Sequence, residues 1–297
     1  MNLTALIVTF NRLEKLKKTI QATLALPFKF IVIVNNASSD GTAAWLKTIE
    51  DIRVIVINLP INSGGAGGFK IGAQHICDNI ETDWITFYDD DARPESKLIN
   101  SFDKINPDMD SVYCGRVLDE TGNDCKMNIP WKKRPVSFRQ NYYYFRNPQD
   151  FIISPDEKCL AITFSFVGCI ISRKVLEQNW KEIKDKLFIY YDDVIFSWYL
   201  TKKNIKIKYE PSLIYYHDIN QINTGLMPEW KVYYLIRNLI LSRKIYGADS
   251  FYSHPAIIFR LAKYLISGLN QFDKRKYYSY VMNGIVDGLR NISGKRH

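Results

Sequence analysis

One stretch of the chain decides the fold: Trp84-Ile85-Thr86-Phe87-Tyr88-Asp89-Asp90-Asp91. Its apolar and aromatic part is typical of a short buried β-strand. In an α/β protein, the carboxyl end of such a strand faces the crevice where ligands bind. Adjacent carboxylates repel one another unless a cation neutralises them, and oxygen ligands suit Mg²⁺ or Mn²⁺ held against substrate phosphates. The triplet therefore indicates either a metal site for a diphosphate-bearing substrate or a solvated acidic turn.

Strand-like and helix-like segments alternate on the N-terminal side of this stretch. Apolar strands are predicted at residues 3–10, 30–34 and 54–57, and helices at residues 13–24, 42–49 and 69–80. Such alternation predicts a doubly wound α/β fold with a parallel sheet and right-handed crossovers. This pattern resembles a Rossmann-like, mostly parallel sheet.

Polar clusters follow each of the four predicted strands: residues 11–12, 35–40, 62–68 and 89–91. Because parallel strands end at one edge of a sheet, we expect these clusters to meet there. The glycine-rich cluster does not fit a dinucleotide fingerprint or a phosphate-binding P-loop, because Phe69 and Lys70 stand where glycine is required. Either the backbone of this cluster approaches a ligand closely, or the cluster forms a purely structural turn.

Regular structure is harder to predict beyond residue 100. Residues 100–165 look irregular, a strand is expected at 164–171, and helices are expected near Arg173 and from Asp192. Short strands are expected at 206–209 and 212–217, and the chain turns helical from Glu229. Asp192-Asp193 is either helix-terminal charge or a general base. His217, after a strand, is either an ordinary core or surface residue or a metal ligand.

Charge is distributed unevenly along the 297 residues. Residues 1–230 contain 28 Lys/Arg and 28 Asp/Glu, whereas residues 231–297 contain 12 Lys/Arg and 3 Asp/Glu. The basic C-terminal region suits anionic lipid or nucleic acid, and no recognised nucleic-acid motif accompanies it, so no nucleic acid is expected. Five cysteines without a C-x-x-C pair fit a reducing cytoplasm. The N-terminus has no basic signal-peptide region, which also favours a cytoplasmic protein.

Apolar residues recur at three-four spacing over residues 278–289 and predict an amphipathic helix. The apolar run at residues 257–266 contains two charges and is too short to span a bilayer. The C-terminal helices either pack on the body or lie at an anionic membrane surface, with Lys274-Arg275-Lys276 near the lipid. The second alternative would place the protein peripherally on the inner face of the cell membrane.

Taken together, several motifs resemble family 2 glycosyltransferases with the GT-A fold: residues 8–12, 34–42 and the aspartate triplet. The segment 62–69 is similar to bacterial galactofuranosyltransferases and their rhamnosyltransferase relatives, and residues 191–193, His217 and 283–289 extend the resemblance over most of the chain. The resemblance implies a GT-A domain at 1–228, with a nucleotide-binding half at 1–100 and an acceptor half at 101–228. A basic, amphipathic helical region would follow at 229–297.

The resemblance also implies roles for individual residues. Donor and substrate contacts would come from Thr9, Phe10, Arg12, Asn36, Asp40, Asn62, Gly64, Gly65, Lys70, Asp90 and Asp192; Asp89, Asp91 and His217 would bind Mn²⁺ or Mg²⁺; Asp193 would be the catalytic base. Two positions depart from the family pattern. Asn35 stands where aspartate is common, and Lys70-Ile71 stands where Asn-Arg is common, so Lys70 would act as a point charge near the diphosphate.

One base and one metal site fit a single displacement that inverts the sugar, better than a retaining hydrolase with two catalytic carboxylates. The resemblance implies transfer of galactofuranose from UDP-galactofuranose to an oligosaccharide or lipid-linked acceptor of a surface glycan, such as O-antigen, capsule or cell wall. A dTDP-rhamnose-dependent transferase and a non-catalytic nucleotide-sugar- or glycan-binding subunit are the alternatives. The aromatic residues at 131–151 would either stack on acceptor sugars or pack internally.

Overall fold

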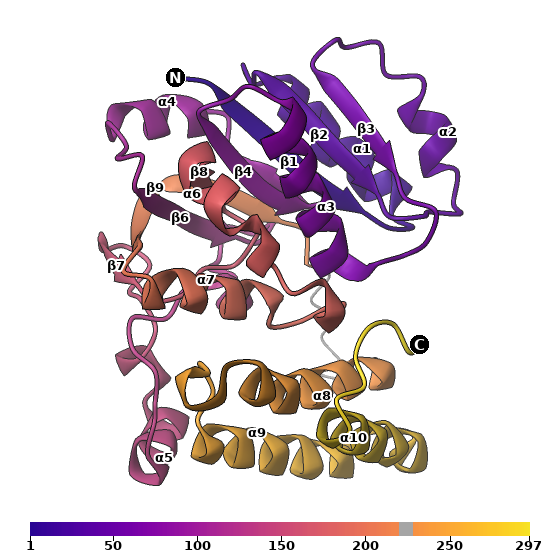
Figure 1. Ribbon diagram of the computed structural model, residues 1–297, viewed down its shortest axis with the longest axis vertical. Helices are drawn as coiled ribbons and strands as arrows, with labels where there is room; N and C mark the ends of the chain where they lie inside the picture. The colour runs from indigo at the N-terminus through magenta and orange to yellow at the C-terminus, as the bar shows by residue number, and fades with distance from the viewer. Residues whose placement is uncertain (220–227) are drawn as a thin grey trace.

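A single large sheet forms the centre of the molecule. The computed structural model describes residues 1–219 and 228–297 of the chain. Residues 220–227, the end of the predicted 1–228 domain, lie outside the described residues. The strands are β1 (Leu3–Thr9), β2 (Phe30–Asn35), β3 (Val54–Asn58), β4 (Trp84–Asp89), β5 (Ala92–Pro94), β6 (Ser111–Leu118), β7 (Cys159–Ala161), β8 (Cys169–Ser172) and β9 (Lys206–His217). Helices cover the sheet, and three long helices gather at one end of the molecule (Figure 1).

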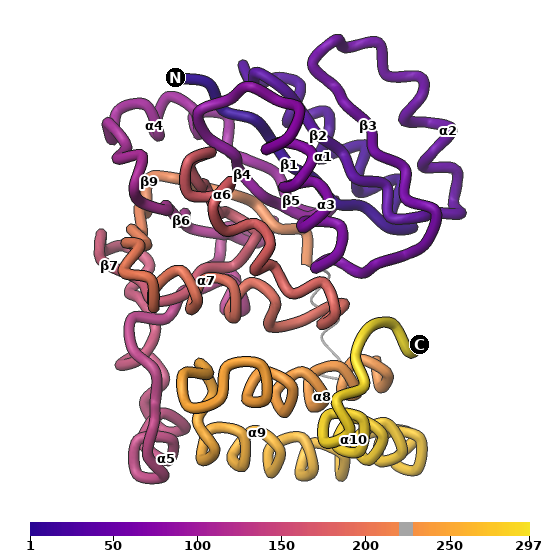
Figure 2. Tube along the Cα trace, viewed as in Figure 1, coloured from indigo at the N-terminus to yellow at the C-terminus, as the bar shows by residue number. Residues whose placement is uncertain are grey.

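The helices are α1 (Leu13–Leu24), α2 (Thr42–Leu46), α3 (Gly64–Asn79), α4 (Leu98–Lys104), α5 (Phe138–Arg146), α6 (Arg173–Asn179), α7 (Asp192–Lys202), α8 (Glu229–Tyr246), α9 (His254–Ser267) and α10 (Lys274–Leu289). Short 3₁₀ turns connect several of them, including one at Asp185–Leu187 just before α7. In the Cα trace of Figure 2, α7 runs between the sheet and α8. The segment that leads into α7 therefore lies where the sheet and the C-terminal helices meet.

The strand order is β3-β2-β1-β4-β8-β6-β9-β5, with β7 paired to β9. Strands β1 to β4 pair in parallel, as predicted from the alternation of the first 90 residues. The other half is mixed: β8 runs antiparallel to both β4 and β6, and β5 and β7 run antiparallel to β9. The prediction of an α/β fold is confirmed, and the antiparallel strands lie beyond the segment from which the parallel sheet was inferred.

Three predicted segments differ from the structure. Residues 100–165 are not irregular, because they contain most of α4 together with β6, α5 and β7. The strand expected at 164–171 begins only at Cys169, since Gly168 has a φ of +90° and the preceding residues turn. The two strands expected at 206–217 are one, β9, whose pairing with β6 shifts register after Gly115. A bulge of this kind accommodates Pro211, which cannot donate a ladder hydrogen bond.

Both faces of the parallel strands are covered, which explains why β1 is buried along its whole length. Leu6 and Val8 pack in one core with Phe69 of α3. Leu3 and Ile7 point to the other face, into a second core that contains α1. Burial on both sides fixes the strand ends, and with them the polar residues that follow.

Helix α10 packs against α8, where a Cβ at Gly284 would lie only 2.8 Å from the Tyr233 carbonyl oxygen. The predicted amphipathic helix at 278–289 is thus present within α10. Its apolar stripe is divided: Val281 is buried, whereas Met282 and Leu289 are exposed. Among the helices of residues 1–219 and 228–297, none combines the length and apolarity needed to cross a bilayer.

Candidate active site

The loops after the parallel strands contact one another at one edge of the sheet. The Phe10 N–H donates to Asp90 Oδ2 at 3.1 Å, and the Ser39 N–H donates to Asn11 Oδ1 at 2.7 Å. Asn36 donates through Nδ2 to the Gly64 carbonyl at 2.9 Å. The polar clusters expected at this edge therefore do meet there, although they come from four separate parts of the sequence.

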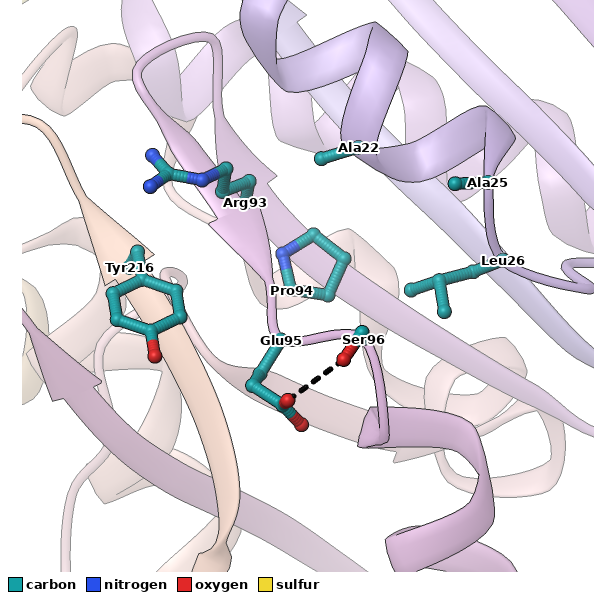
Figure 3. Close-up of a pocket in the computed structure, with 8 residues that line it drawn as sticks. All are labelled: Ala22, Ala25, Leu26, Arg93, Pro94, Glu95, Ser96 and Tyr216. Atoms are coloured by element: carbon teal, nitrogen blue, oxygen red, sulfur yellow. Dashed lines mark hydrogen bonds between the residues drawn. The ribbon is translucent and has the colours of Figure 1, made fainter.

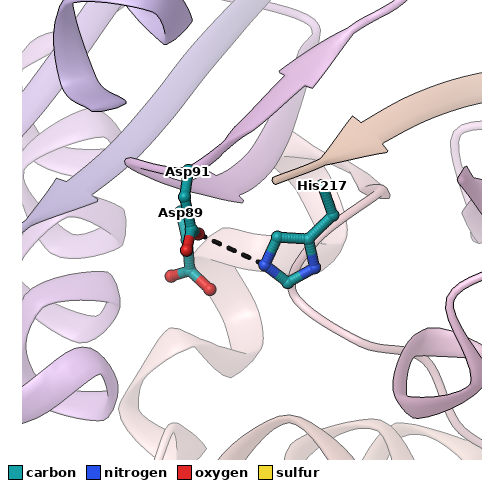
Figure 4. A group of neighbouring side chains, drawn as sticks. All are labelled: Asp89, Asp91 and His217. Atoms are coloured by element: carbon teal, nitrogen blue, oxygen red, sulfur yellow. Dashed lines mark hydrogen bonds and ion pairs between the residues drawn. The ribbon is translucent and has the colours of Figure 1, made fainter. Parts of the chain in front are cut away.

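Asp89, Asp91 and His217 form the candidate metal cluster (Figure 4), in which one ligand atom from each residue lies within 4.8 Å of the others. Asp89 ends β4, and the chain turns directly into β5. The antiparallel register of β5 and β9 places His217 opposite Ala92. His217 Nε2 consequently lies 3.2 Å from Asp91 Oδ1, across 126 positions of sequence.

The two carboxyl groups of this cluster have pKa values that are shifted in opposite directions. Burial, together with the neighbouring Asp91, raises the pKa of Asp89 to about 7. Burial also acts to raise the pKa of Asp91, but the hydrogen bond from His217 and the charge of Arg12 outweigh it, and that pKa is lowered. A divalent cation would relieve the repulsion between the carboxylates, and two carboxylates with one imidazole suit Mn²⁺ or Mg²⁺. The donor set therefore fits the metal that was predicted.

Arg12 is the principal basic partner of the aspartate triplet. Its Nη1 lies 2.5 Å from Asp91 Oδ2 and 3.3 Å from Asp90 Oδ1. Lys15 Nζ lies 3.6 Å from Asp91 Oδ2. Burial raises the pKa of Asp90 to about 6, against the opposing charge of Arg12. Arg12 is half exposed, so it can also face a ligand at this edge.

Asp192 and Asp193 occupy the first turn of α7, where the helix dipole favours negative charge. Burial raises the pKa of Asp193 to about 6, although hydrogen bonds from the Val194 N–H and the Ser165 hydroxyl lower it. Asp192 is buried, and its pKa is raised well above the usual value by burial and by the charge of Asp193. Asp89 also contributes to that rise, so the carboxylate pair lies near the metal cluster.

A chain of hydrogen bonds connects the metal cluster to Asp193. His217 Nδ1 lies 3.1 Å from Asn128 Oδ1, and Asn128 Nδ2 donates to Ser165 Oγ at 2.9 Å. Ser165 in turn hydrogen-bonds to Asp193. Neither Asn128 nor Ser165 was predicted, because each lies in a segment with no local motif and acts only through tertiary contacts.

The loop before α7 has an unusual backbone. Phe188, Tyr190 and Tyr191 all have positive φ, between 65° and 70°. Gly64, with a φ of +75°, fits against this loop, because a Cβ there would lie 2.1 Å from the Phe188 carbonyl oxygen. That carbonyl accepts the Ala66 N–H at 3.2 Å. The glycine-rich segment thus packs closely against the loop that leads to Asp192 and Asp193.

Helix α8 holds the same loop from the opposite side. Asn238 Nδ2 donates to the carbonyls of Leu187 at 3.0 Å, Ile189 at 2.6 Å and Tyr190 at 3.1 Å. The fully buried Arg237 donates to the Leu187 carbonyl at 2.8 Å and packs on two tyrosine rings. The C-terminal helices therefore support the site directly, whereas the sequence predicted only that they pack on the body or lie at a membrane surface.

The remaining predicted residues take several positions. Thr9 is buried at the end of β1. Asn62 Oδ1 accepts the Gly64 N–H at 2.9 Å, and Gly65 has open space around it. Asp40 closes the turn before α2, where its side chain accepts from Leu13 and Thr42. Lys70 pairs with Asp185 at 2.7 Å, so in this structure its ammonium group is engaged by the loop before α7 and not by the aspartate triplet.

A separate surface pocket of about 430 Å³ opens between the end of α1 and strands β5 and β9 (Figure 3). It is lined by Ala22, Ala25, Leu26, Arg93, Pro94, Glu95, Ser96 and Tyr216. No residue predicted for the site is among them. Arg93 pairs with Glu120 and lies over the Tyr216 ring.

The mixed α/β sheet, parallel in its N-terminal half, is similar to the GT-A fold of solved structures. Staphylococcus aureus TarS (residues 1–349) superposes with a TM-score of 0.57 at 14% identity, covering 97% of this chain and 81% of that one. GalNAc-T7, solved with UDP, GalNAc and Mn²⁺, superposes with a TM-score of 0.59 at 14% identity, covering 98% and 58%. At this identity the similarity establishes the fold, and the predicted GT-A fold is confirmed.

The family follows from the sequence. The model of the family described as glycosyl transferase family 2 matches residues 4–180, more than half of the chain. The chain belongs to glycosyltransferase family 2. It is 31% identical over 99 residues to galactofuranosyltransferase GlfT1 of Mycolicibacterium smegmatis, covering 33% of this chain and 32% of that protein. The same protein of Mycobacterium tuberculosis is 31% identical over 98 residues, covering 32% of each. The matched segment spans about a third of the length of these relatives.

Proposed function

We propose that the chain is an inverting, metal-dependent galactofuranosyltransferase that uses UDP-galactofuranose and builds a surface glycan. The observation that carries the proposal is the convergence of two groups at one sheet edge. The cluster of Asp89, Asp91 and His217 lies near the Asp192–Asp193 pair, and a hydrogen-bond chain joins them. A transferase needs both: charge stabilisation for the leaving diphosphate and a base for the acceptor.

The donor would lie along the edge formed by the loops after β1 to β4. Asp89, Asp91 and His217 would hold Mn²⁺ or Mg²⁺, which would offset charge that develops on the leaving diphosphate. Thr9, Phe10 and Arg12 would lie against the nucleotide, with Asn36 and Asp40 toward base and ribose. Asn62, Gly64, Gly65 and Lys70 would complete the donor side, and Asp90 would face the sugar. The presence of UDP and Mn²⁺ in the structure of GalNAc-T7 supports this arrangement.

Asp193 would be the general base. Asp193 is half-buried, whereas Asp192 is buried. With a pKa of about 6, Asp193 is mainly ionised at neutral pH and is still basic enough to accept a proton from an acceptor hydroxyl. Asp192, whose pKa is raised much further, would orient a sugar hydroxyl. A single base opposite a diphosphate leaving group favours one displacement with inversion.

The name of the relatives supports galactofuranose as the transferred sugar, and dTDP-rhamnose is the alternative donor. The acceptor would be an oligosaccharide or a lipid-linked glycan. Residues 1–228 would form the catalytic domain, with the nucleotide on the 1–100 half and the acceptor on the 101–228 half. The region 229–297 would belong to the catalytic unit in function, because α8 holds the loop that carries Asp193.

A donor screen tests this proposal. The purified chain is incubated with Mn²⁺, a panel of oligosaccharide acceptors and one donor at a time: UDP-galactofuranose, UDP-galactopyranose, UDP-glucose or dTDP-rhamnose. Release of nucleoside diphosphate is followed with and without EDTA. We expect EDTA-sensitive release from UDP-galactofuranose. EDTA-sensitive release from dTDP-rhamnose alone would show that dTDP-rhamnose is the donor in place of UDP-galactofuranose. If no donor releases nucleoside diphosphate, a non-catalytic binding subunit would be favoured.

Two variants separate catalysis from binding. Asp193→Asn removes the base but keeps the shape of the side chain, so turnover should fall by about 10²–10⁴-fold while donor affinity changes little. Asp78→Asn, at an exposed position on α3, makes the same chemical change elsewhere and should leave turnover unchanged. Turnover of Asp193→Asn near that of the parent protein would show that the base has been assigned wrongly.

A further inference from the structure

Three helices from distant parts of the sequence form the end of the molecule opposite the parallel strands: α5, α9 and α10 (Figure 1). Helix α5 contacts α9 through Phe259, whose ring centre lies 6.3 Å from that of Phe138 and 5.9 Å from that of Phe145. Helix α10 contacts α9 through the Tyr278 hydroxyl, which donates to the Leu265 carbonyl at 2.9 Å. We call the solvent-facing side of these three helices the outer face.

The outer face is apolar, although the inner faces of the same helices already provide their packing. On α9, Ile257 is buried, whereas Ile258 and Ile266 are 51% and 65% exposed. Just after α9, Phe272 is 98% exposed. These side chains contribute little to the core, and exposed apolar groups of this size in one region usually mark a binding surface.

The same pattern holds on the other two helices. On α10, Val281 is buried against α8, whereas Met282 is 55% exposed and Leu289 is 60% exposed. On α5, Phe138 and Phe145 are both more than half exposed. Exposed apolar side chains therefore occur on all three helices, α5, α9 and α10.

Charge on these helices is almost entirely positive. Together α5, α9 and α10 contain seven Lys/Arg and one acidic residue, Asp287. Asp287 is buried, where it accepts from the Tyr233 hydroxyl and pairs with Arg296, so it does not offset charge on the outer face. Within the described residues, Arg139, Lys263 and Arg275 are exposed and make no ion pair.

We propose that the outer face docks the protein on an anionic lipid bilayer, with the apolar side chains entering the headgroup region and the Lys/Arg residues meeting lipid phosphates. Interfacial amphipathic helices combine these two features. A second copy of the chain fits the surface less well, because an isologous contact would place positive charge against positive charge. Nucleic acid would engage the basic groups but would leave the aliphatic side chains without a partner.

The proposal also bears on the aromatic residues at 131–151, which were predicted either to stack on acceptor sugars or to pack internally. Trp131 and Tyr144 lie 4.9 Å apart between ring centres, and Arg260 of α9 lies over both rings. Those two rings therefore pack internally. Phe138 and Phe145 instead belong to the outer face, and their exposure is accounted for by lipid contact.

Vesicle co-sedimentation of the full chain, without any donor, tests the proposal independently of transferase activity. Vesicles of phosphatidylcholine alone are compared with vesicles that also contain phosphatidylglycerol, at low and high salt. We expect binding to the anionic vesicles that weakens with salt. Absence of binding, or equal binding to both vesicle types, would overturn the proposal.

Paired variants locate the contact. The double variants Ile266→Asn with Phe272→Asn, and Lys274→Glu with Arg275→Glu, should each lower the vesicle partition coefficient by about tenfold or more. The control Ile52→Asn with Ile61→Asn changes two exposed isoleucines that lie outside α5, α9 and α10. The control Lys47→Glu with Lys104→Glu makes the same change in net charge on exposed positions near α2 and α4.

Circular dichroism confirms that each variant is folded, and sedimentation velocity reports self-association. Equal losses of vesicle binding in the outer-face variants and their controls would overturn the assignment of the surface. A dimer of the parent chain that Ile266→Asn with Phe272→Asn dissociates would also overturn it, in favour of a second copy as the occupant. Activity in the donor screen together with absence of vesicle binding would overturn only the membrane proposal.

Discussion

Asn128 holds the imidazole ring of His217 in one orientation, with Asn128 Oδ1 3.1 Å from His217 Nδ1. Because Asn128 Nδ2 donates to Ser165 Oγ, the amide oxygen is the atom left to accept from the ring. His217 Nε2 then points to Asp91, where a metal would bind. This is the usual relation between a metal-binding histidine and the residue that orients it.

Replacing Asn128 should therefore weaken metal binding without removing a ligand. For Asn128→Ala we expect Mn²⁺ affinity to fall by about 10–100-fold, the typical effect of losing such a partner. Titration calorimetry with Mn²⁺ measures it directly. Asn283→Ala, on the exposed side of α10, is the control and should bind Mn²⁺ as the parent chain does. Unchanged affinity in Asn128→Ala would argue against His217 as a ligand.

Ser165 should tune the proposed base. Its hydrogen bond lowers the pKa of Asp193, which burial raises to about 6. Losing the hydroxyl in Ser165→Ala should raise that pKa further, so a higher pH is needed to ionise Asp193. The acid limb of kcat/KM, expected near pH 6, should move upward by up to ~1 pH unit. Ser279→Ala, exposed on α10, should leave the limb in place. A limb that stays fixed or moves downward in Ser165→Ala would contradict the assignment.

The N-terminal half of the site could be predicted because its information is local. An apolar strand that ends in carboxylates predicts both β4 and the position of Asp89 to Asp91. Antiparallel pairing of β5 with β9 carries no such signal, since a three-residue strand has no periodicity, yet this pairing helps to bring His217 to Asp91. Before the structure, His217 could be assigned to the metal only through resemblance to a family.

The residues that hold Asp193 and its loop in place could not be predicted, for a related reason. Ser165 lies in a segment expected to be a strand, but β8 begins only at Cys169, and the Ser165 hydroxyl hydrogen-bonds to Asp193 of α7. Asn238 and Arg237 look like polar residues on an amphipathic helix, where exposure is the default expectation. Their burial results from a loop 50 residues earlier whose carbonyl groups have no partner in regular structure.

Gly64 and its neighbour Gly65 provide a matched test of how the glycine-rich segment packs against the loop before α7. A Cβ at Gly64 would collide with the Phe188 carbonyl, and its φ of +75° is unfavourable for other residues. Gly64→Ala should therefore destabilise the protein by about 2 kcal/mol or more and reduce turnover by displacing the loop. Gly65 has open space, so Gly65→Ala should be neutral or should stabilise α3 by up to ~1 kcal/mol. Urea unfolding measures both, and equal effects would disprove the packing argument.

Asn238 is expected to link the C-terminal helices to catalysis. Asn238→Ala leaves the carbonyls of Ile189 and Tyr190 without their side-chain donor, whereas the Leu187 carbonyl keeps Arg237. The backbone conformation of this loop is unfavourable on its own. We expect a loss of about 1–3 kcal/mol in unfolding free energy. Turnover should fall by more than donor KM changes, because the loop positions Asp193 and not the nucleotide.

Asn179 supplies the control that separates stability from positioning. It is also buried, and its Nδ2 donates to the Val175 carbonyl at 2.7 Å within α6. Asn179→Ala should lower the unfolding free energy to a similar degree, yet leave kcat unchanged at a temperature where the variant is folded. If both variants lose stability but neither loses turnover, α8 supports the fold alone. If only Asn238→Ala loses turnover, the helices beyond residue 228 are part of the catalytic unit.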